Sequence, residues 1–334
     1  MRGFDYIRPK TSREAVSAFA SAAAGARYIA GGTTLYDLMK LNIEKPPLLI
    51  DVTDIEGLNA IDITGERLRF GALALMSEVA GEPVVARDYP VLAESLQKAA
   101  SQQLRNMATV GGNLLQRTRC MYFRNGANGV YPCNKREPGS GCAAIGGLDR
   151  GQAVLGGSAS CNAVSPGDWP VALMAMDASV EIVGPAGHRR MAIADLYRLP
   201  GETPHLEFSL APGELVIAIE VPTTAAGRGS TYHKIRDRES YAFALASAAV
   251  VLDMQDDRVA RARIALGGVA TRPWRASEAE EMLRGQRVTL ESAMQAGRAA
   301  FLAAQPGQHN GFKLELGART LADALLIAAE RSRK

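Results

Sequence analysis

The hydrophobic pattern of the first fifty residues alternates between the spacing of strands and that of helices. An edge strand leads into a capping box of Thr11 and Glu14, and a later strand stops at a glycine pair. The predicted elements are a strand over 4–9, a helix carrying Ala15, Val16 and Phe19, a strand over 27–30, a helix over 35–41 and a strand over 48–51. Strand, glycine turn, helix and strand in this order are typical of a phosphate-binding unit.

The rest of the chain predicts a mixed region and then a separate domain. Residues 222–231 have linker composition and mark the boundary. Before it we expect strands over 68–70, 179–183, 190–191 and 214–221 and helices over 90–101 and 169–177; after it we expect strands over 241–254 and 258–269 and helices over 276–284, 290–304 and 321–331. Strands followed by helices predict an α+β domain with helices on one face of an antiparallel sheet.

Composition narrows the class of protein and of partner. At 334 residues, 47% hydrophobic and 22% charged, the chain suits two or three packed soluble domains. A net charge of +3 without a basic stripe does not suggest nucleic acid, so proteins and small molecules are the expected partners. No apolar run is long enough for a signal peptide or a membrane span. We therefore expect a cytoplasmic protein by its own sequence, and export to the periplasm bound to a signal-bearing partner stays open.

Two glycine pairs are candidates for binding phosphate. Residues 30–34 (AGGTT) and 109–113 (TVGGN) each allow several N–H groups to point one way, with hydroxyl or amide side chains beside them. Ordinary structural turns are the alternative for each. Two such segments in one chain favour a dinucleotide, although neither matches the P-loop or the G-x-G-x-x-G motif.

The four cysteines of the chain, Cys120, Cys133, Cys142 and Cys161, all fall in one segment that also holds nine glycines. Four thiolates suit a zinc ion or a cubane iron–sulfur cluster, and they suit disulfides only in an oxidising compartment. The gaps of twelve, eight and eighteen residues match no C-x-x-C pattern. A local excess of basic residues favours an anionic cluster, and no histidine lies in the segment.

Several segments together resemble the FAD-binding medium subunit of the xanthine dehydrogenase and aldehyde oxidoreductase family of molybdenum hydroxylases. They are residues 29–34 (IAGGTT), 104–113 (LRNMATVGGN), 165–168 (SPGD), 266–270 (LGGVA) and 272–273 (RP). The resemblance covers essentially the whole chain. It implies an α+β fold, with a two-subdomain FAD-binding domain of the vanillyl-alcohol-oxidase type (PCMH-like) followed by a small α+β domain. The expected boundaries are 1–60, 61–222 and 229–334.

An insertion at about 114–162 separates the second glycine motif from Asp168 and contains all four cysteines. It resembles the subgroup of bacterial, periplasmic-type aldehyde oxidoreductases whose flavin subunit carries an added [4Fe-4S] cluster. The matching elements are residues 116–120 (QRTRC), 133–135 (CNK) and 139–142 (GSGC). By this resemblance the metal ligands are Cys120, Cys133, Cys142 and Cys161.

The resemblance also implies which residues bind FAD. Both glycine motifs would hold the pyrophosphate, Asp168 would bind ribose or ribityl hydroxyls, and Leu215 would touch the edge of the cofactor. Lys234 or Arg236 would place a cation near the flavin ring, which stabilises its anionic reduced form. The full expected set is Arg27, Tyr28, Ile29, Ala30, Gly31, Gly32, Thr33, Thr34, Thr109, Gly111, Gly112, Asn113, Thr118, Asp168, Leu215 and Lys234.

The implied function is electron transfer within a heterotrimeric molybdenum-dependent aldehyde oxidoreductase. A large molybdenum-cofactor subunit would oxidise an aldehyde to a carboxylic acid, and a small [2Fe-2S] subunit would deliver electrons to FAD for an external acceptor. A zinc-stapled FAD protein and a non-catalytic nucleotide-binding scaffold are the alternatives.

Overall fold

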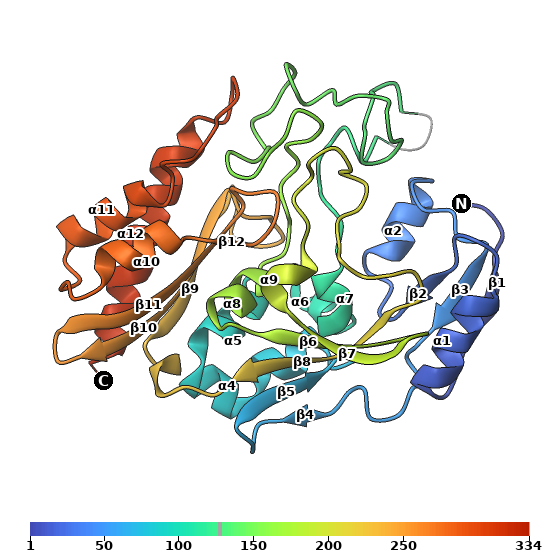
Figure 1. Cartoon of the computed structure of the whole chain (residues 1–334), viewed down its shortest axis with the longest axis horizontal. Helices are drawn as coiled ribbons and strands as arrows, with labels where there is room; N and C mark the ends of the chain where they lie inside the picture. The colour runs from blue at the N-terminus through green and yellow to red at the C-terminus, as the bar shows by residue number, and fades with distance from the viewer. Residues whose placement is uncertain (126–128, 334) are drawn as a thin grey trace.

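Three sheets organise the chain, each built from one consecutive part of the sequence (Figure 1). The computed structural model describes residues 1–125 and 129–333. The first sheet is parallel, with strand order β1-β3-β2, and its two crossovers are helical, as parallel strands require. Its elements are β1 (Asp5–Ile7), α1 (Ser12–Ser21), β2 (Arg27–Ile29), α2 (Leu35–Lys40) and β3 (Leu48–Asp51). The strand and helix order expected for residues 4–51 is confirmed.

The second sheet is antiparallel, with strand order β4-β5-β8-β6-β7, and it shares the largest core with a set of short helices. Trp169 and Phe70 are fully buried at its centre, and their rings meet edge to face at 5.9 Å. The strands are β4 (Ile61–Asp62), β5 (Arg67–Gly71), β6 (Ser179–Gly184), β7 (Gly187–Ala192) and β8 (Leu215–Pro222); the helices are α3 (Met76–Gly81), α4 (Pro83–Asp88), α5 (Pro90–Gln97), α6 (Gln102–Arg105), α7 (Val110–Leu114), α8 (Trp169–Ala175) and α9 (Ile193–Leu196).

The third sheet has the order β12-β11-β10-β9, and its helices cover one face of it (Figure 1). Its elements are η1 (Ala225–Gly227), β9 (Ser230–Ile235), β10 (Ala246–Gln255), β11 (Arg258–Gly267), β12 (Trp274–Arg275), α10 (Ser277–Leu283), α11 (Leu290–Ala299) and α12 (Phe312–Arg331). The prediction of strands followed by helices in this part of the chain is confirmed. Helix α12 begins at Phe312, earlier than the predicted residue 321. The sequence pattern missed its first turns because their buried face carries Lys313 and Gly317 instead of an apolar stripe.

Two predicted elements are shorter than expected for a backbone reason. The strand predicted from Tyr241 begins only at Ala246, and the helix predicted to reach Ser101 ends at Gln97. Tyr241 has a φ of +55° and Ala100 a φ of +48°, which is left-handed backbone that neither a strand nor a right-handed helix contains. The chain turns away at both points.

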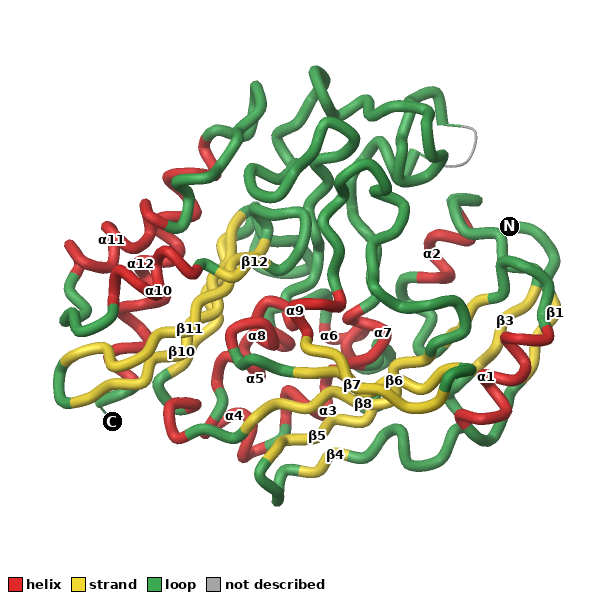
Figure 2. The backbone as a smooth tube through the Cα atoms, viewed as in Figure 1, coloured by secondary structure: helices red, strands yellow, loops and turns green. Residues whose placement is uncertain are grey.

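The cysteine segment forms no helix or strand in its described part, as the run of loop between α7 and α8 shows (Figure 2). Side chains and the C-terminal domain hold it instead. The Asp149 carboxylate accepts hydrogen bonds from the backbone N–H groups of Gln308 (2.9 Å) and His309 (2.8 Å). Asn310 Nδ2 donates to the carbonyl of Gln152 at 3.3 Å. The geometry of the segment therefore depends on the docking of that domain.

Close packing of α11 on α12 gives a first prediction. A Cβ added at Gly297 would overlap the Ala318 carbonyl, whereas one added at the exposed Gly81 meets nothing. We expect Gly297→Ala to lower the free energy of unfolding by about 1–3 kcal/mol, because the helices must move apart. Gly81→Ala is the matched control, expected within about 0.5 kcal/mol of wild type. Urea unfolding compares the two, and equal midpoints would contradict the contact.

Lys313 gives a pH-dependent prediction. Its Nζ donates to the Gly268 carbonyl at 2.7 Å, and burial lowers the pKa of its ammonium from 10.5 to about 8. Because the unfolded chain holds this proton more tightly, stability should rise between about pH 8 and pH 10, by up to about 1.4 kcal/mol per pH unit. In Lys313→Met that rise should disappear, and in the exposed Lys40→Met it should persist. Urea unfolding across this pH range is the measurement; an unchanged rise in Lys313→Met would refute the assignment.

Candidate functional site

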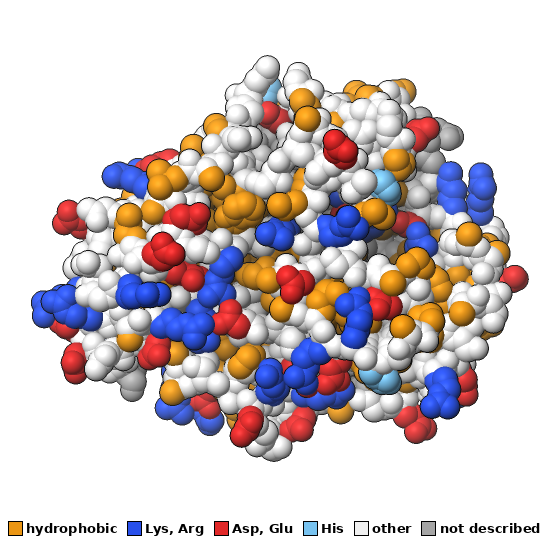
Figure 3. Space-filling view, viewed as in Figure 1, with side chains coloured by type: hydrophobic (Ala, Val, Ile, Leu, Met, Phe, Trp, Pro, Cys, Tyr) orange, Lys and Arg blue, Asp and Glu red, His pale blue; other side chains and the backbone are white. Residues whose placement is uncertain are grey.

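A single large cleft brings the predicted binding residues together. Its volume is about 1540 Å³, and drug-sized ligands usually occupy roughly 300–1,000 Å³, so the cleft suits a longer molecule. Fifteen of the sixteen predicted binding residues border it, and Lys234 does not. They come from β2, α7, β8 and the loops between them. The surface seen in Figure 3 mixes acidic and basic side chains, without a field of one sign.

The two glycine motifs meet at the cleft through backbone contact. A Cβ on Gly31 would overlap the carbonyl of Met107, and one on Gly111 would lie 2.7 Å from the Ala72 Cβ. Gly32 has a φ of +70°, which glycine adopts without strain. These glycines are thus required for close approach and for turning. The fold therefore requires the same glycines that are predicted to bind phosphate.

Polar groups around the second motif are only partly satisfied. Thr109 caps α7 by accepting from the N–H of Gly112 at 3.2 Å, and Asn113 Nδ2 donates to Met76 Sδ at 3.4 Å. Within the described residues, Asn113 Oδ1 is buried and has no hydrogen-bond partner. Such a group costs free energy unless something donates to it, so a bound donor at this edge of the cleft is expected. Thr118, further along, donates to the Val164 carbonyl at 2.9 Å.

Asp168 and Lys234 form a buried ion pair behind the cleft wall. Lys234 Nζ lies 2.8 Å from Asp168 Oδ2, and the Tyr232 hydroxyl donates to Oδ1 at 2.6 Å. The Lys234 side chain is fully buried and also donates to the Lys98 carbonyl at 2.9 Å. Burial raises the pKa of the Asp168 carboxyl, and the Lys234 charge opposes the rise. Lys234 itself does not border the cleft, but it pairs with Asp168, which does. That Lys234 places a cation near a bound flavin ring stays a prediction.

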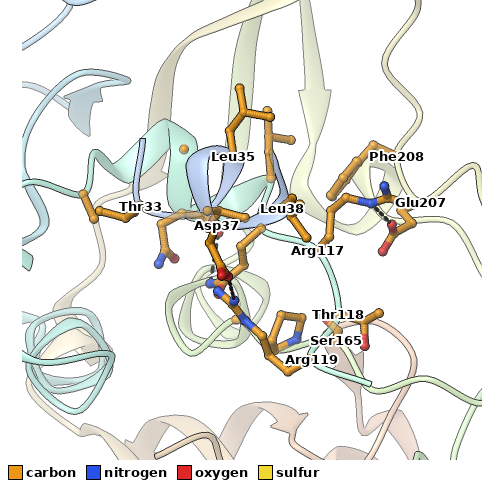
Figure 4. Close-up of a pocket in the computed structure, with 18 of the residues that line it drawn as sticks. Thr33, Leu35, Asp37, Leu38, Arg117, Thr118, Arg119, Ser165, Glu207 and Phe208 are labelled. Atoms are coloured by element: carbon orange, nitrogen blue, oxygen red, sulfur yellow. Dashed lines mark hydrogen bonds and ion pairs between the residues drawn. The ribbon is translucent and has the colours of Figure 1, made fainter. Parts of the chain in front are cut away.

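Arginines of the cysteine segment border the cleft and were not predicted as binding residues. Arg117 pairs with Glu44 at 2.7 Å and with Glu207 at 2.5 Å, and Arg119 pairs with Asp37 at 3.1 Å (Figure 4). The carboxylates come from distant parts of the chain. The local count of basic residues therefore overstated the positive charge available to a cluster. Arg119 also lies over the Phe243 ring at 5.0 Å, in the loop between β9 and β10, whose residues from 241 onward were predicted as strand.

The four cysteines border one small cavity, which we call the thiol pocket. All four are free of disulfides, and Cys133 and Cys142 pair as an antiparallel bridge. Burial raises the pKa of the Cys161 thiol to about 11 and also raises that of Cys120. Among the described residues, no three His, Cys, Asp or Glu side chains form a group that could hold a metal ion. A tetrahedral zinc ion would need sulfurs about 3.8 Å apart, since each Zn–S bond is about 2.3 Å long.

Comparison with known proteins identifies the family. Residues 2–224 match the family described as the FAD binding domain in molybdopterin dehydrogenase, and residues 230–328 match the CO dehydrogenase flavoprotein C-terminal domain. The chain belongs to the FAD-binding medium subunits of the molybdenum hydroxylases. The aldehyde oxidoreductase FAD-binding subunit PaoB of Escherichia coli is 47% identical over 98% of this chain and 99% of its own length. The carbon monoxide dehydrogenase medium chain of Afipia carboxidovorans is 30% identical over 84% and 80%.

Solved structures agree with this molybdenum hydroxylase assignment. Carbon monoxide dehydrogenase from Oligotropha carboxidovorans superposes with a TM-score of 0.78 at 27% identity, covering 99% of both chains. The enzyme from Hydrogenophaga pseudoflava gives 0.77 at 27%, covering 99% and 98%. The predicted α+β fold is confirmed, and the chain is the flavin subunit of a multi-subunit oxidoreductase. No helix in the described residues is long and apolar enough to cross a membrane.

The buried ion pair of this flavin subunit gives a prediction. Lys234→Met should lower the free energy of unfolding by about 3–5 kcal/mol, because it leaves the Asp168 carboxylate buried without its cation. Adding Asp168→Asn should recover part of that loss. Denaturant unfolding of the single and double variants tests this, and a double variant no more stable than Lys234→Met would argue against the pair.

Proposed function

We propose that the chain is the FAD and [4Fe-4S]-containing electron-transfer subunit of a molybdenum-dependent aldehyde oxidoreductase. The observation that carries the proposal is the adjacency of the two cavities: the cleft bordered by both glycine motifs and the thiol pocket share Cys120. The 47% identity to a protein named as an aldehyde oxidoreductase subunit supports an aldehyde as the substrate of the complex.

The cleft has the donors and acceptors that FAD requires. The two glycine motifs offer N–H groups for a pyrophosphate, and Asn113 Oδ1 is a buried acceptor for a hydroxyl or ring N–H. In the described part of the chain, Arg119 Nε and Arg124 NH1 are buried donors without hydrogen-bond partners, and both residues border the cleft. In this proposal FAD contacts the predicted residues except Lys234. We propose that the Asp168 carboxylate faces the ribityl or ribose hydroxyls and that the buried Lys234 ammonium keeps this carboxylate ionised by pairing with it.

The thiol pocket has the donor set of an iron–sulfur cluster. Four thiols and, among the described residues, no histidine border one small cavity, and [4Fe-4S] clusters are held by four Cys thiolates. Cys120, Cys133, Cys142 and Cys161 are the proposed ligands. The zinc-stapled protein is the alternative, because the same four thiols could also hold a tetrahedral zinc ion.

The residues of this chain bind, orient and shield, and the cofactor supplies the redox chemistry. When bound, FAD would supply electron transfer in single or paired steps to an external acceptor. Phe243 and Tyr241, each about half exposed at the rim of the cleft, would limit water access to the ring. The buried Lys234 keeps positive charge near the cleft, which favours a ring that gains negative charge on reduction.

The wider assembly in this proposal follows the same relatives. A large molybdenum-cofactor subunit and a small [2Fe-2S] subunit are the proposed partners. Residues 1–60 and 61–222 are proposed as the two FAD-binding subdomains, with the cluster insertion at about 114–162, and 229–334 as the C-terminal domain. Assembly with a signal-bearing partner would carry the chain to the periplasm.

Metal and flavin analysis of the anaerobically purified complex tests the proposal. We expect flavin absorption together with iron and acid-labile sulfide in equal amounts. Cys142→Ser should lose about four irons per flavin, keep the iron of the small [2Fe-2S] subunit and keep the flavin. Ser140→Ala removes the hydroxyl that accepts from the Cys133 N–H at 3.0 Å but no thiol, so it should keep all the iron and the flavin. Zinc in place of iron would overturn the cluster, and absence of flavin would overturn the FAD site.

A further inference from the structure

Cys120 is the one cysteine of the four that borders both the cleft and the thiol pocket. Gln152 lies against it: the amide Nε2 donates to the Cys120 sulfur at 3.4 Å, and Gln152 itself borders the cleft. The wall between the two cavities therefore consists in part of one sulfur and one amide.

The sulfur of Cys120 receives several N–H donors. Against the burial that raises the pKa of its thiol, the backbone N–H groups of Phe123 and Tyr122 lower that pKa, and the Gln152 side chain donates to the sulfur at 3.4 Å. Cys161 receives the N–H of Ala163 at 3.5 Å. Donors of this kind stabilise negative charge on sulfur. Of the three donors to Cys120, only the Gln152 amide can be removed by changing a side chain.

The Gln152 amide is fixed in place. The residue is 3% exposed, its N–H donates to the Asp149 carbonyl at 2.8 Å, and its carbonyl accepts from Asn310 Nδ2. Among the described residues, Gln152 Oε1 is buried and has no hydrogen-bond partner. A thiolate sulfur only accepts hydrogen bonds, so a metal-bound Cys120 selects the orientation with NH₂ toward sulfur. Leaving the oxygen unsatisfied costs stability, which suggests that the contact with sulfur serves function.

We propose that Gln152 is a positioning residue that raises the reduction potential of the cluster by donating its amide N–H to the Cys120 thiolate. The proposal rests on the cluster of the proposed function. Reduction adds negative charge to the cluster and its sulfurs, and a hydrogen-bond donor to sulfur favours the more negative state. Because Cys120 borders the cleft, the reduction potential of the cluster that it would hold bears directly on electron exchange with FAD.

Potentiometric titration of the anaerobic holoenzyme, followed by the electron paramagnetic resonance signal of the reduced cluster, tests the role. Gln152→Leu removes the donor at similar volume, and we expect its cluster midpoint at a more negative potential than wild type. Gln152→Glu keeps the shape but places a carboxylate at the sulfur, so its midpoint should fall further. Gln116→Leu is the matched control: its amide borders the same cleft but donates to the Asn113 carbonyl at 3.2 Å, and the cluster potential should not move.

The outcomes separate this inference from the proposed function. Iron in all three variants, with midpoints equal to that of wild type, would overturn the role of Gln152 and leave the cluster intact. If both Gln152 variants lose the [4Fe-4S] signal and about four irons per flavin while Gln116→Leu keeps them, Gln152 is needed to build the site, and the tuning role is wrong. A wild-type complex with only the iron of the [2Fe-2S] subunit would overturn the cluster itself, and with it this inference.

Discussion

The cleft depends on a backbone contact between the turn after β2 and the segment that leads into α7. Gly31 lies directly against Met107, and any side chain at Gly31 would push the parallel sheet away from the helices that pack on the second sheet. Only this approach lets the turn after β2 and the start of α7 border one cavity. The cavity then takes its remaining walls from β8, from the cysteine segment and from the loop before β10. The binding surface thus results from the packing of three parts of the chain, and the close contact at Gly31 sets the distance between two of them.

Charge is buried around this cleft in pairs, and the pairing decides what a ligand can use. Asp168 is satisfied by Lys234 and Tyr232, so its carboxylate presents a fixed group to the cavity that already has hydrogen-bond partners within the protein. Asp37 accepts from Arg119 and Arg124, yet each arginine keeps one buried donor free of hydrogen bonds within the described residues. Anionic groups of a ligand could meet those donors without the cost of desolvating a bare charge.

Local sequence pattern predicted much of the fold, the family resemblance implied most of the lining, and both failed where long-range pairing decides. The order of strands and helices and both glycine turns follow from spacing and residue type, and the shared pocket of the cysteines follows from their clustering in one segment. The partners of Arg117 could not be found this way, because Glu44 and Glu207 lie far from it in the chain. Lys234 was assigned to the cleft by resemblance, and its burial behind Asp168 depends on the register of β9 against β10. No local sequence pattern indicates the left-handed backbone at Tyr241, which lies in the loop outside the pairing of β9 with β10.

A segment without regular structure must satisfy its backbone by other means, and this ties the thiol pocket to the C-terminal domain. Asp149 accepts from the loop before α12, Gln305 N–H donates to the Val154 carbonyl at 2.7 Å, and Asn310 reaches the Gln152 carbonyl. Gln152 in turn holds the sulfur of Cys120. The position of that sulfur relative to the cleft is therefore set by domain packing rather than by the cysteine loop alone. A partner subunit that shifted the C-terminal domain would alter the sulfur's hydrogen bonding before it altered the glycine walls of the cleft, because Gly31 and Met107 belong to the other two parts.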